Sequence, residues 1–504
     1  MGMQVAIPRA VQLVLDDVGW REGWRLDGTG GPFRAGIDRL LDVRDYEAIA
    51  DIGEAVGTRP TAAMILCEWD RENVCARHPT STQSGAAWDN SARAGPWSEE
   101  AADVFLRRAQ HIELALHGVG HEHWEDGVPT RAESYGAKGV KRDWAGLRGH
   151  LDCFRAILDQ HGLGPEAGHR FPIHCVPAAF CYLWDENDPT DTGALMAAAG
   201  VELISTPFSS GGFHRRTPLL APDGGVDHGL LVIDRGNTGV PWYALDSVPS
   251  DVGGGISGTD SHDTTRGVSP RNRGTVRFWS ICGIHWPNIL REDPEENHIA
   301  VRRWIDYLRA VAEQPGVMLA ANVRECFAQW AYHAFGRVEP TEGGFVLDTT
   351  AVPDALLDVV GDMPVVIEIA SADEPVSVSS NALRPVWYRH QDATAYVAFA
   401  RPGRTRAEVT VETAREPIEP VVLRDGTFNV LHVRPTQEGV DIELEVFGTQ
   451  GVPIAAGFAP TAVESVDDAL SVERHSHDPT CGVTTVSVSG RDIQGHKGTI
   501  RLLG

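Results

Sequence analysis

A change in hydrophobic periodicity near residue 335 is the feature that most constrains the fold of this 504-residue chain. Before it, short apolar runs alternate with segments whose apolar residues recur at helical spacing. After it, runs such as 395–399 and 441–446 alternate with period two and are separated by Gly, Pro and Asp-Gly turns, without a convincing helix. We therefore predict an α/β region over residues 1–335 and an all-β region over residues 336–504, built as one or two β-sandwich modules.

The first region alternates strands and helices, which predicts a parallel sheet with helices packed outside it, here closed into a (β/α) barrel. The predicted strands are 11–15, 61–66, 112–116, 171–176, 202–205, 230–233 and 278–284. The predicted helices begin at Asp42, run from an N-cap at Ser98 to Gln110, and cover 144–160, 195–199 and 301–311. The Gly-, Asp-, Ser- and Arg-rich stretch 252–273 is predicted to be a long surface loop.

The charge and the cysteine pattern exclude several classes of partner. A formal net charge of −26 argues against binding to a nucleic-acid backbone or to anionic lipid. No apolar run has the length of a membrane span, and residues 1–10 lack the pattern of a secretory signal. The eight cysteines form no Cys-x-x-Cys pair, which disfavours a zinc ribbon or a disulfide scaffold. We expect a cytoplasmic protein, with a secreted protein that has lost its signal as the alternative.

Three polar motifs follow predicted strands, where barrels place catalytic groups. They are the adjacent pair Asp16 and Asp17, the His-x-x-x-His pair His117 and His121, and the late His285. Each has a structural explanation when it is taken alone. Asp also begins ordinary turns, two of twenty histidines can fall four apart by chance, and a single histidine after a strand is more often structural.

Taken together, the motifs match what a mononuclear metal hydrolase requires. Two imidazoles and one carboxylate can hold a metal ion with a position left open. A second carboxylate can then act as general base and a distant imidazole as general acid. All three motifs fall in the same α/β region, which favours a common site.

These motifs resemble those of the polysaccharide deacetylases, the NodB-homology or carbohydrate esterase family 4 group. Over residues 9–330 the resemblance implies a distorted, seven-stranded (β/α) barrel. It also implies that Asp17, His117 and His121 bind one divalent ion, with zinc favoured over cobalt, nickel or manganese. Asp16 would be the general base and His285 the general acid. This sequence has Gly118 and Glu122 after the two histidines, where central members of the family carry Ser or Thr and then Pro.

Two further motifs of the family have no clean match. For its Arg-x-Pro-Tyr motif, which orients the base, either the segment around Arg170 or the segment 176–180 is available. For its motif that places an acid near a tryptophan, either Trp242 with Asp246 or the pair at 234–235 is available. His123 adds a third imidazole near the histidine pair. The candidate substrate-binding residues are therefore Arg170, His123, Trp242 and Asp246.

The resemblance predicts a deacetylase that removes an acyl group, most simply acetyl, from the amide of an N-acetylated amino sugar or polysaccharide. A glycoside hydrolase on the same architecture is one alternative, with Asp16 and Asp246 as its two carboxylates. The histidine pair would then have no role, so metal dependence separates the two. A non-catalytic carbohydrate-binding protein is the other alternative, with Trp387 and Tyr388 of the β region gripping sugar. Packing alone is the simpler role for that region.

Overall fold

The computed structural model describes residues 4–23, 34–136, 140–249, 279–370, 376–391, 393–413 and 420–504. The chain divides into two compact units. Val11–Val311 form the first, which we call the α/β unit, and Met1–Ala10 with Ala312–Gly504 form the second, the β-rich unit. The sequence predicted the boundary some twenty-five residues later, at 335. The predicted surface loop at 252–273 lies outside the described residues.

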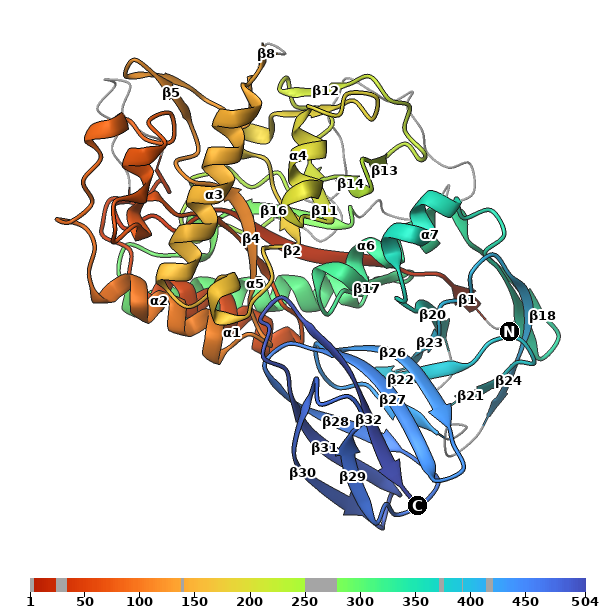
Figure 1. The fold of residues 1–504 in the computed structure, drawn as a ribbon. Coiled ribbons are helices and arrows are strands. Elements are labelled where there is room, and N and C mark those ends of the chain that lie inside the picture. Colours follow the sequence, from red (N-terminus) through yellow and green to blue (C-terminus); the bar gives the residue numbers. More distant parts are fainter. Residues whose placement is uncertain are drawn as a thin grey trace. The chain divides into compact units, whose positions relative to one another are not determined.

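A curled parallel sheet is the centre of the α/β unit (Figure 1). Its strand order is β13–β14–β11–β9–β4–β3–β2–β16–β15, and every neighbouring pair is parallel except β13 with β14. The prediction of a parallel α/β sheet is confirmed. Within the described part of the chain the edge strands β13 and β15 do not pair with each other, so the sheet is a curled half-barrel. The strands are β2 (Arg9–Val18), β3 (Thr61–Ile65), β4 (Glu113–Gly118), β9 (His174–Cys175), β11 (Leu203–Thr206), β13 (Gly224–Asp227), β14 (Leu230–Asp234), β15 (Gly236–Asn237) and β16 (Ile281–His285).

Helices and short strands complete the unit, and α3 packs against β4 (Figure 1). Asp42 caps α1 through a capping box, as its position before an apolar-periodic segment predicted. The helices are α1 (Val43–Val56), α2 (Pro96–Arg107), α3 (Trp144–Gln160), α4 (Thr192–Ala199) and α5 (Asn297–Ala312). The short strands are β5 (His123–Glu125), β6 (Val128–Thr130), β7 (Tyr135–Gly136), β8 (Val140–Lys141), β10 (Tyr182–Trp184) and β12 (Phe213–Arg215).

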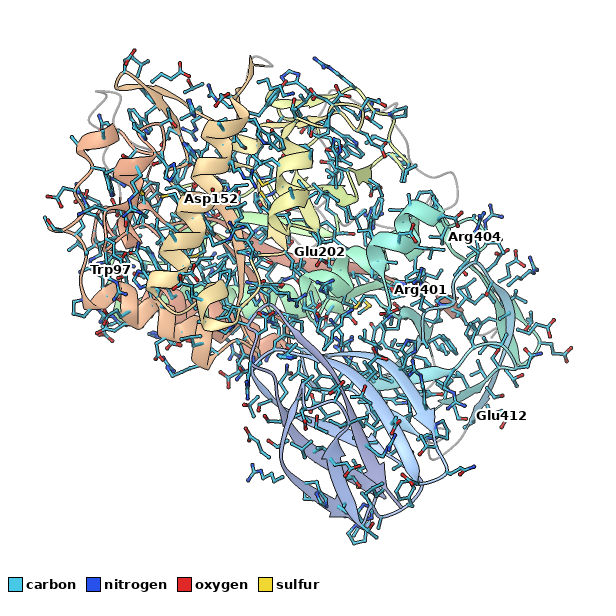
Figure 2. The ribbon with its side chains drawn as sticks, viewed as in Figure 1. Trp97, Asp152, Glu202, Arg401, Arg404 and Glu412 are labelled. Carbon is cyan, nitrogen blue, oxygen red and sulfur yellow. The ribbon has the colours of Figure 1, made fainter. Side chains whose placement is uncertain are left out.

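The predicted start of α2 is wrong. Ser98 lies inside the helix and its hydroxyl donates back to the Gly95 carbonyl, whereas Gly95 is the N-cap and Pro96 the first helical residue. Proline suits that position because it lacks an N–H that would find no partner there. The helix starts three residues earlier than predicted and includes Trp97, labelled in Figure 2, whose ring lies edge-on against Trp69 with centroids 6.1 Å apart.

The β-rich unit contains three sheets, with strand orders β1–β20–β23–β22–β25–β28–β31–β30, β18–β19–β24–β21 and β26–β27–β32–β29. The period-two runs 395–399 and 441–446 fall on β23 and β27 as predicted, but α7 shows that the expectation of no helix is wrong. The elements are β1 (Gln4–Ala6), β17 (Val317–Leu319), α6 (Val323–Phe335), β18 (Arg337–Thr341), β19 (Gly344–Asp348), α7 (Asp354–Val360), β20 (Val365–Ala370), β21 (Val376–Ser379), β22 (Pro385–Gln391), β23 (Thr394–Phe399), β24 (Arg406–Thr413), β25 (Val421–Leu423), β26 (Asn429–Pro435), β27 (Gly439–Val446), β28 (Thr449–Ala455), β29 (Ala462–Ser465), β30 (Ser471–Asp478), β31 (Val483–Ser489) and β32 (His496–Leu503).

The two aromatic residues proposed to grip sugar belong to the core of this unit. Trp387 is 0% exposed and Tyr388 is 1% exposed. The Tyr388 hydroxyl accepts a hydrogen bond from the Val378 N–H, so it holds β21 and β22 together. A sugar cannot reach either ring without unfolding the sheet, and this part of the carbohydrate-binding hypothesis is wrong. None of the described helices has the length and apolar character that crossing a bilayer requires.

The end of β2 is irregular in a way that positions polar side chains. Leu15 pairs with Ala62 and Val18 with Met64 of β3, so β2 carries one extra residue between these pairs. Such a bulge redirects the side chains within it. Directly after β2, Gly19 has φ +121°, and a Cβ atom built there would lie 2.1 Å from the Ile65 carbonyl oxygen.

We predict that Gly19→Ala lowers the free energy of unfolding by at least about 2 kcal/mol, because the methyl group forces β2 and β3 apart in a disfavoured backbone conformation. Gly57→Ala is the matched control. Gly57 also has positive φ, +69°, but nothing lies within 4 Å of the added Cβ. That variant should lose only about 1 kcal/mol. Urea denaturation measures both, and equal losses would show that the close approach to Ile65 is unimportant.

Candidate metal centre and pocket

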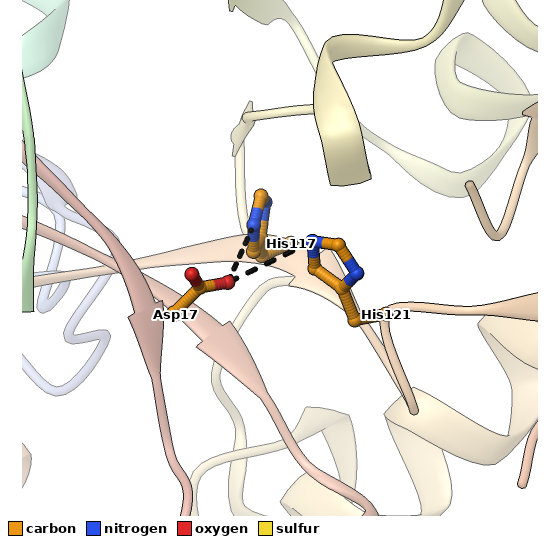
Figure 3. A group of neighbouring side chains, drawn as sticks. All are labelled: Asp17, His117 and His121. Atoms are coloured by element: carbon orange, nitrogen blue, oxygen red, sulfur yellow. Dashed lines mark ion pairs between the residues drawn. The ribbon is translucent and has the colours of Figure 1, made fainter. Parts of the chain in front are cut away.

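Three side chains converge at the carboxyl edge of the sheet (Figure 3). Asp17 comes from β2, His117 from β4, and His121 from the loop after β4, and their ligand atoms all lie within 4.8 Å of one another. Asp17 Oδ1 is 3.4 Å from His117 Nε2 and 3.7 Å from His121 Nε2. Two ligands bound tetrahedrally to zinc at about 2.1 Å are separated by about 3.4 Å. The spacing therefore fits a shared ion without rearrangement.

The hydrogen bonding of His117 points its other nitrogen at Asp17. Its Nδ1 lies 2.6 Å from the Val176 carbonyl oxygen, which can only accept, so Nδ1 carries the proton. In the neutral ring the Nε2 lone pair then faces the carboxylate of Asp17. The buried Oδ1 of Asp17 has no hydrogen-bond partner among the described residues. Two acceptors that face each other away from water need a cation between them.

Protons and a metal ion would compete for this cluster. Burial alone would raise the pKa of Asp17, but the contact with His117 and the charges of His121 and His285 outweigh it, and the pKa is lowered. Burial alone would lower the pKa of His117, but the nearby carboxylates Asp17 and Asp16 outweigh it and raise the pKa. Metal binding should therefore release protons and weaken as the pH falls.

Two of the three candidate ligands have a backbone conformation that is rare for residues other than glycine. Asp17 has φ 61° and His121 has φ 68°. Such a conformation costs roughly 1–3 kcal/mol per residue and persists only where surrounding contacts enforce it. At Asp17 the bulge at the end of β2 enforces it.

At His121, the buried carboxylate of Glu133 holds the backbone of the loop in this conformation. Glu133 accepts hydrogen bonds from the N–H groups of Val119, Gly120 and His121, at 2.9–3.2 Å. The His150 ring lies 2.8 Å from the same carboxylate. Burial would raise the pKa of Glu133, but His150 and these N–H groups lower it, so the group stays charged. A Cβ at Gly118 would lie 2.3 Å from Glu133 Oε2, which explains the glycine after His117.

Asp16 is held by an arginine that lies between β14 and β15. The Arg235 guanidinium donates to both carboxylate oxygens of Asp16, at 2.7 and 2.6 Å, and both residues are buried. Arg235 follows β14 and crosses β16 to reach β2. A Cβ at Gly283 of β16 would lie 2.0 Å from the Arg235 side chain, so only glycine leaves room for it.

His285 lies beside the carboxylate pair because β16 is the neighbour of β2, where it pairs in register with Asp16. Its Nε2 is 3.8 Å from Asp17 Oδ2. The Trp242 ring stacks on the imidazole at a centroid distance of 5.2 Å, and the Tyr243 ring meets its edge at 5.3 Å. Burial lowers the pKa of His285, although the charges of Asp17 and Asp16 oppose this.

A pocket of about 360 Å³ joins these groups. Its polar floor is formed by the carboxylate pair and the three imidazoles, and its remaining wall by Arg131, Ala179, Phe180, Trp242 and Tyr243. Ala179 and Phe180 have φ 53° and 56°, two successive strained residues. Arg235 lies over the Phe180 ring at 5.0 Å, which helps to hold that turn.

Three residues that the sequence proposed for substrate binding do not line the pocket. Arg170 is exposed elsewhere on the α/β unit, and Arg235 makes the contact with Asp16 that had been assigned to it. His123 stacks on His150, with Nε2 3.2 Å from Glu125 Oε1. Asp246 forms ion pairs with arginines 291 and 303 at 2.9 and 2.8 Å. Of the four proposed residues, Trp242 alone lies in the pocket.

A second cluster, Asp191, Asp227 and His228, also has ligand atoms within 4.8 Å of one another. Hydrogen bonds link most of its polar atoms, although the buried Oδ1 of Asp227 has no hydrogen-bond partner among the described residues. His228 Nε2 lies 3.0 Å from the Asp185 carbonyl oxygen and 3.1 Å from Asp191 Oδ1, so it faces acceptors as a donor. The Tyr182 hydroxyl donates to Asp227 at 2.7 Å. Burial raises the pKa of Asp227 to about 7, which allows it to hold a proton.

Comparisons with known proteins do not add to this picture: no protein-family model, curated protein or solved structure matches the chain.

Sequence reasoning named Asp16, Asp17, His117, His121 and His285, and the structure brings all five to one pocket. It missed Arg131, Tyr243 and the support from Glu133, and it named Phe180 only within the segment 176–180, one of the two alternatives for the Arg-x-Pro-Tyr motif. Arg235 had a usable signal, since it directly follows a strand at the carboxyl edge of the sheet. Glu133 and Arg131 had none, because both lie in an irregular segment.

We predict that Glu133→Gln weakens zinc binding by roughly 10- to 100-fold, because a neutral amide lacks the negative charge that the three N–H groups and His150 surround, and its NH2 group cannot accept where Oε1 faces His150 and the Val119 N–H. Glu125→Gln is the matched control, since this exposed residue lies in the same segment. Competition with a chelating dye measures both affinities. Equal affinities for the two variants would contradict the role assigned to Glu133.

Proposed function

We propose that the protein is a metal-dependent hydrolase that removes an acyl group from an amide, on a barrel of the polysaccharide-deacetylase type. One observation carries the proposal. The lone pair of His117 Nε2 and the unpartnered Oδ1 of Asp17 face each other in a buried site, with a fixed carboxylate and an imidazole beside them. An acetyl group on an amino sugar is the simplest substrate of this kind.

Asp17, His117 and His121 would hold one divalent ion, with zinc favoured for two imidazoles and one carboxylate. When bound, such an ion supplies Lewis-acid catalysis, which polarises the amide carbonyl and makes a water molecule easier to deprotonate.

Asp16 and His285 divide the proton transfers between them. Asp16 takes a proton from the attacking water while the water oxygen forms its bond to the carbonyl carbon. Arg235 fixes both oxygens of Asp16, so the base does not rotate away. The C–N bond then breaks, and a proton from His285 passes to the leaving nitrogen. The products are a carboxylate and an amine.

Glycoside hydrolysis fits the pocket less well. It needs two carboxylates on opposite sides of the scissile bond, about 5 Å or more apart. Among the described residues, the carboxylates that line the pocket are Asp16 and Asp17, adjacent on one strand. Asp246, the proposed partner, is occupied by two arginines.

The decisive experiment measures the metal content of protein purified without added metal. We expect about one zinc or similar ion per chain in the wild type, and its loss in the double variant His117→Ala, His121→Ala. His228→Ala is the control, because it alters the second cluster of the same residue types and should leave the metal content unchanged. If the wild type holds no metal and takes up none on titration, the proposal is wrong.

We further predict that Asp16→Asn and His285→Gln keep the metal but lower the rate of amide hydrolysis by roughly 10²- to 10⁴-fold, since each removes one proton transfer. Acetate release from N-acetylated amino sugars, followed together with metal content, separates these roles from metal binding. The control is Asp152→Asn on the exposed face of α3 (Figure 2). Loss of metal in either pocket variant would mean that its residue acts as a ligand instead.

A further inference from the structure

Arg131 places a positive charge on the wall of the pocket. It follows β6, is exposed, and lines the same cavity as the proposed ligands. Burial raises the pKa of Tyr243. The Arg131 guanidinium is close enough to the Tyr243 hydroxyl to oppose that rise. Tyr243 in turn contacts His285. The positive charge of Arg131 therefore acts within the pocket, near the side of it where His285 lies.

The charged side chains that surround the pocket balance one another, although the whole chain carries a formal charge of −26. Asp16 and Arg235 neutralise each other, and Asp17 offsets Arg131. A divalent ion at the proposed site would leave two net positive charges in the pocket, on a chain with formal charge −26. A site of this sign would attract an anionic group at short range, against the negative charge of the rest of the chain.

The other walls are flat and apolar. Trp242 is 50% exposed, whereas the His285 ring on which it stacks is buried. The Phe180 ring meets the Trp242 ring edge-on, with centroids 5.9 Å apart. With a volume of about 360 Å³, the pocket has the size of a site for one small molecule.

We propose that the substrate is a small N-acyl compound that carries a carboxylate, and that Arg131 binds this carboxylate while the acyl amide lies at the metal centre. The inference rests on the proposed function and refines its substrate class. A guanidinium recognises a carboxylate through two parallel hydrogen bonds, which fixes the orientation of the ligand as well as binding it. An N-acyl amino acid and an acidic N-acetylated sugar both supply this chemistry.

The test measures binding to metal-free protein, in which hydrolysis cannot consume the ligand. N-acetylglycine is compared with its neutral analogue N-acetylglycinamide, and N-acetylmuramic acid with N-acetylglucosamine, by titration calorimetry. We expect each carboxylate to bind roughly 10-fold or more tightly than its neutral partner. Arg131→Gln should abolish the difference and Arg131→Lys should restore part of it. Arg148→Gln, the same charge change on the exposed face of α3, should leave it intact.

The pair with the larger difference identifies the source of the carboxylate. If neither carboxylate binds more tightly than its neutral partner, or if Arg131→Gln leaves the preference intact, the inference is wrong. Metal binding and acetate release from neutral amides would then still support the proposed function. If the wild type binds no metal but prefers carboxylates through Arg131, the proposed hydrolase fails and the pocket is an anion-binding site.

Discussion

Two adjacent carboxylates, Asp16 and Asp17, are buried at the carboxyl end of β2. The arrangement of the site depends on which groups neutralise their negative charges. A buried carboxylate without a partner costs several kcal/mol, roughly, so each needs a cation or several donors. Arg235 meets the charge of Asp16 with two hydrogen bonds. Asp17 faces the imidazoles of His117 and His121, and this geometry suits a shared metal ion.

Local features far apart in the sequence follow from this requirement. Gly283 lacks a side chain, so Arg235 can cross β16 and reach β2. Glu133 gathers three N–H groups of the loop that ends in His121, and thereby holds that ligand in a left-handed conformation. The bulge at the end of β2 does the same for Asp17. Strain at the proposed ligands is thus balanced by contacts outside the pocket, as is common at functional sites.

The direction of the lone pairs distinguishes the two clusters of potential ligands. In the second cluster, His228 Nε2 is directed at the carbonyl of Asp185 and the carboxylate of Asp191, so it carries a proton, while the buried Oδ1 of Asp227 has no hydrogen-bond partner among the described residues. In the first cluster, the Nδ1 proton of His117 is donated to the Val176 carbonyl, on the side of the ring away from Asp17. That metal-binding residue types lie close together is therefore weak evidence for a metal site. Stronger evidence is that the atoms facing one another are acceptors without protons between them.

The sequence by itself determined the parallel sheet, the bounds of α3, and the meeting of Asp17, His117 and His285. Residues that directly follow parallel strands reach the same edge whatever the loops do. Only the tertiary structure decided that Arg235, and not Arg170, pairs with Asp16, and that the candidates His123 and Asp246 have other partners. It also placed Trp387 and Tyr388 in the core. These outcomes depend on contacts between residues far apart in the chain, and strand periodicity carries no information about which of them form.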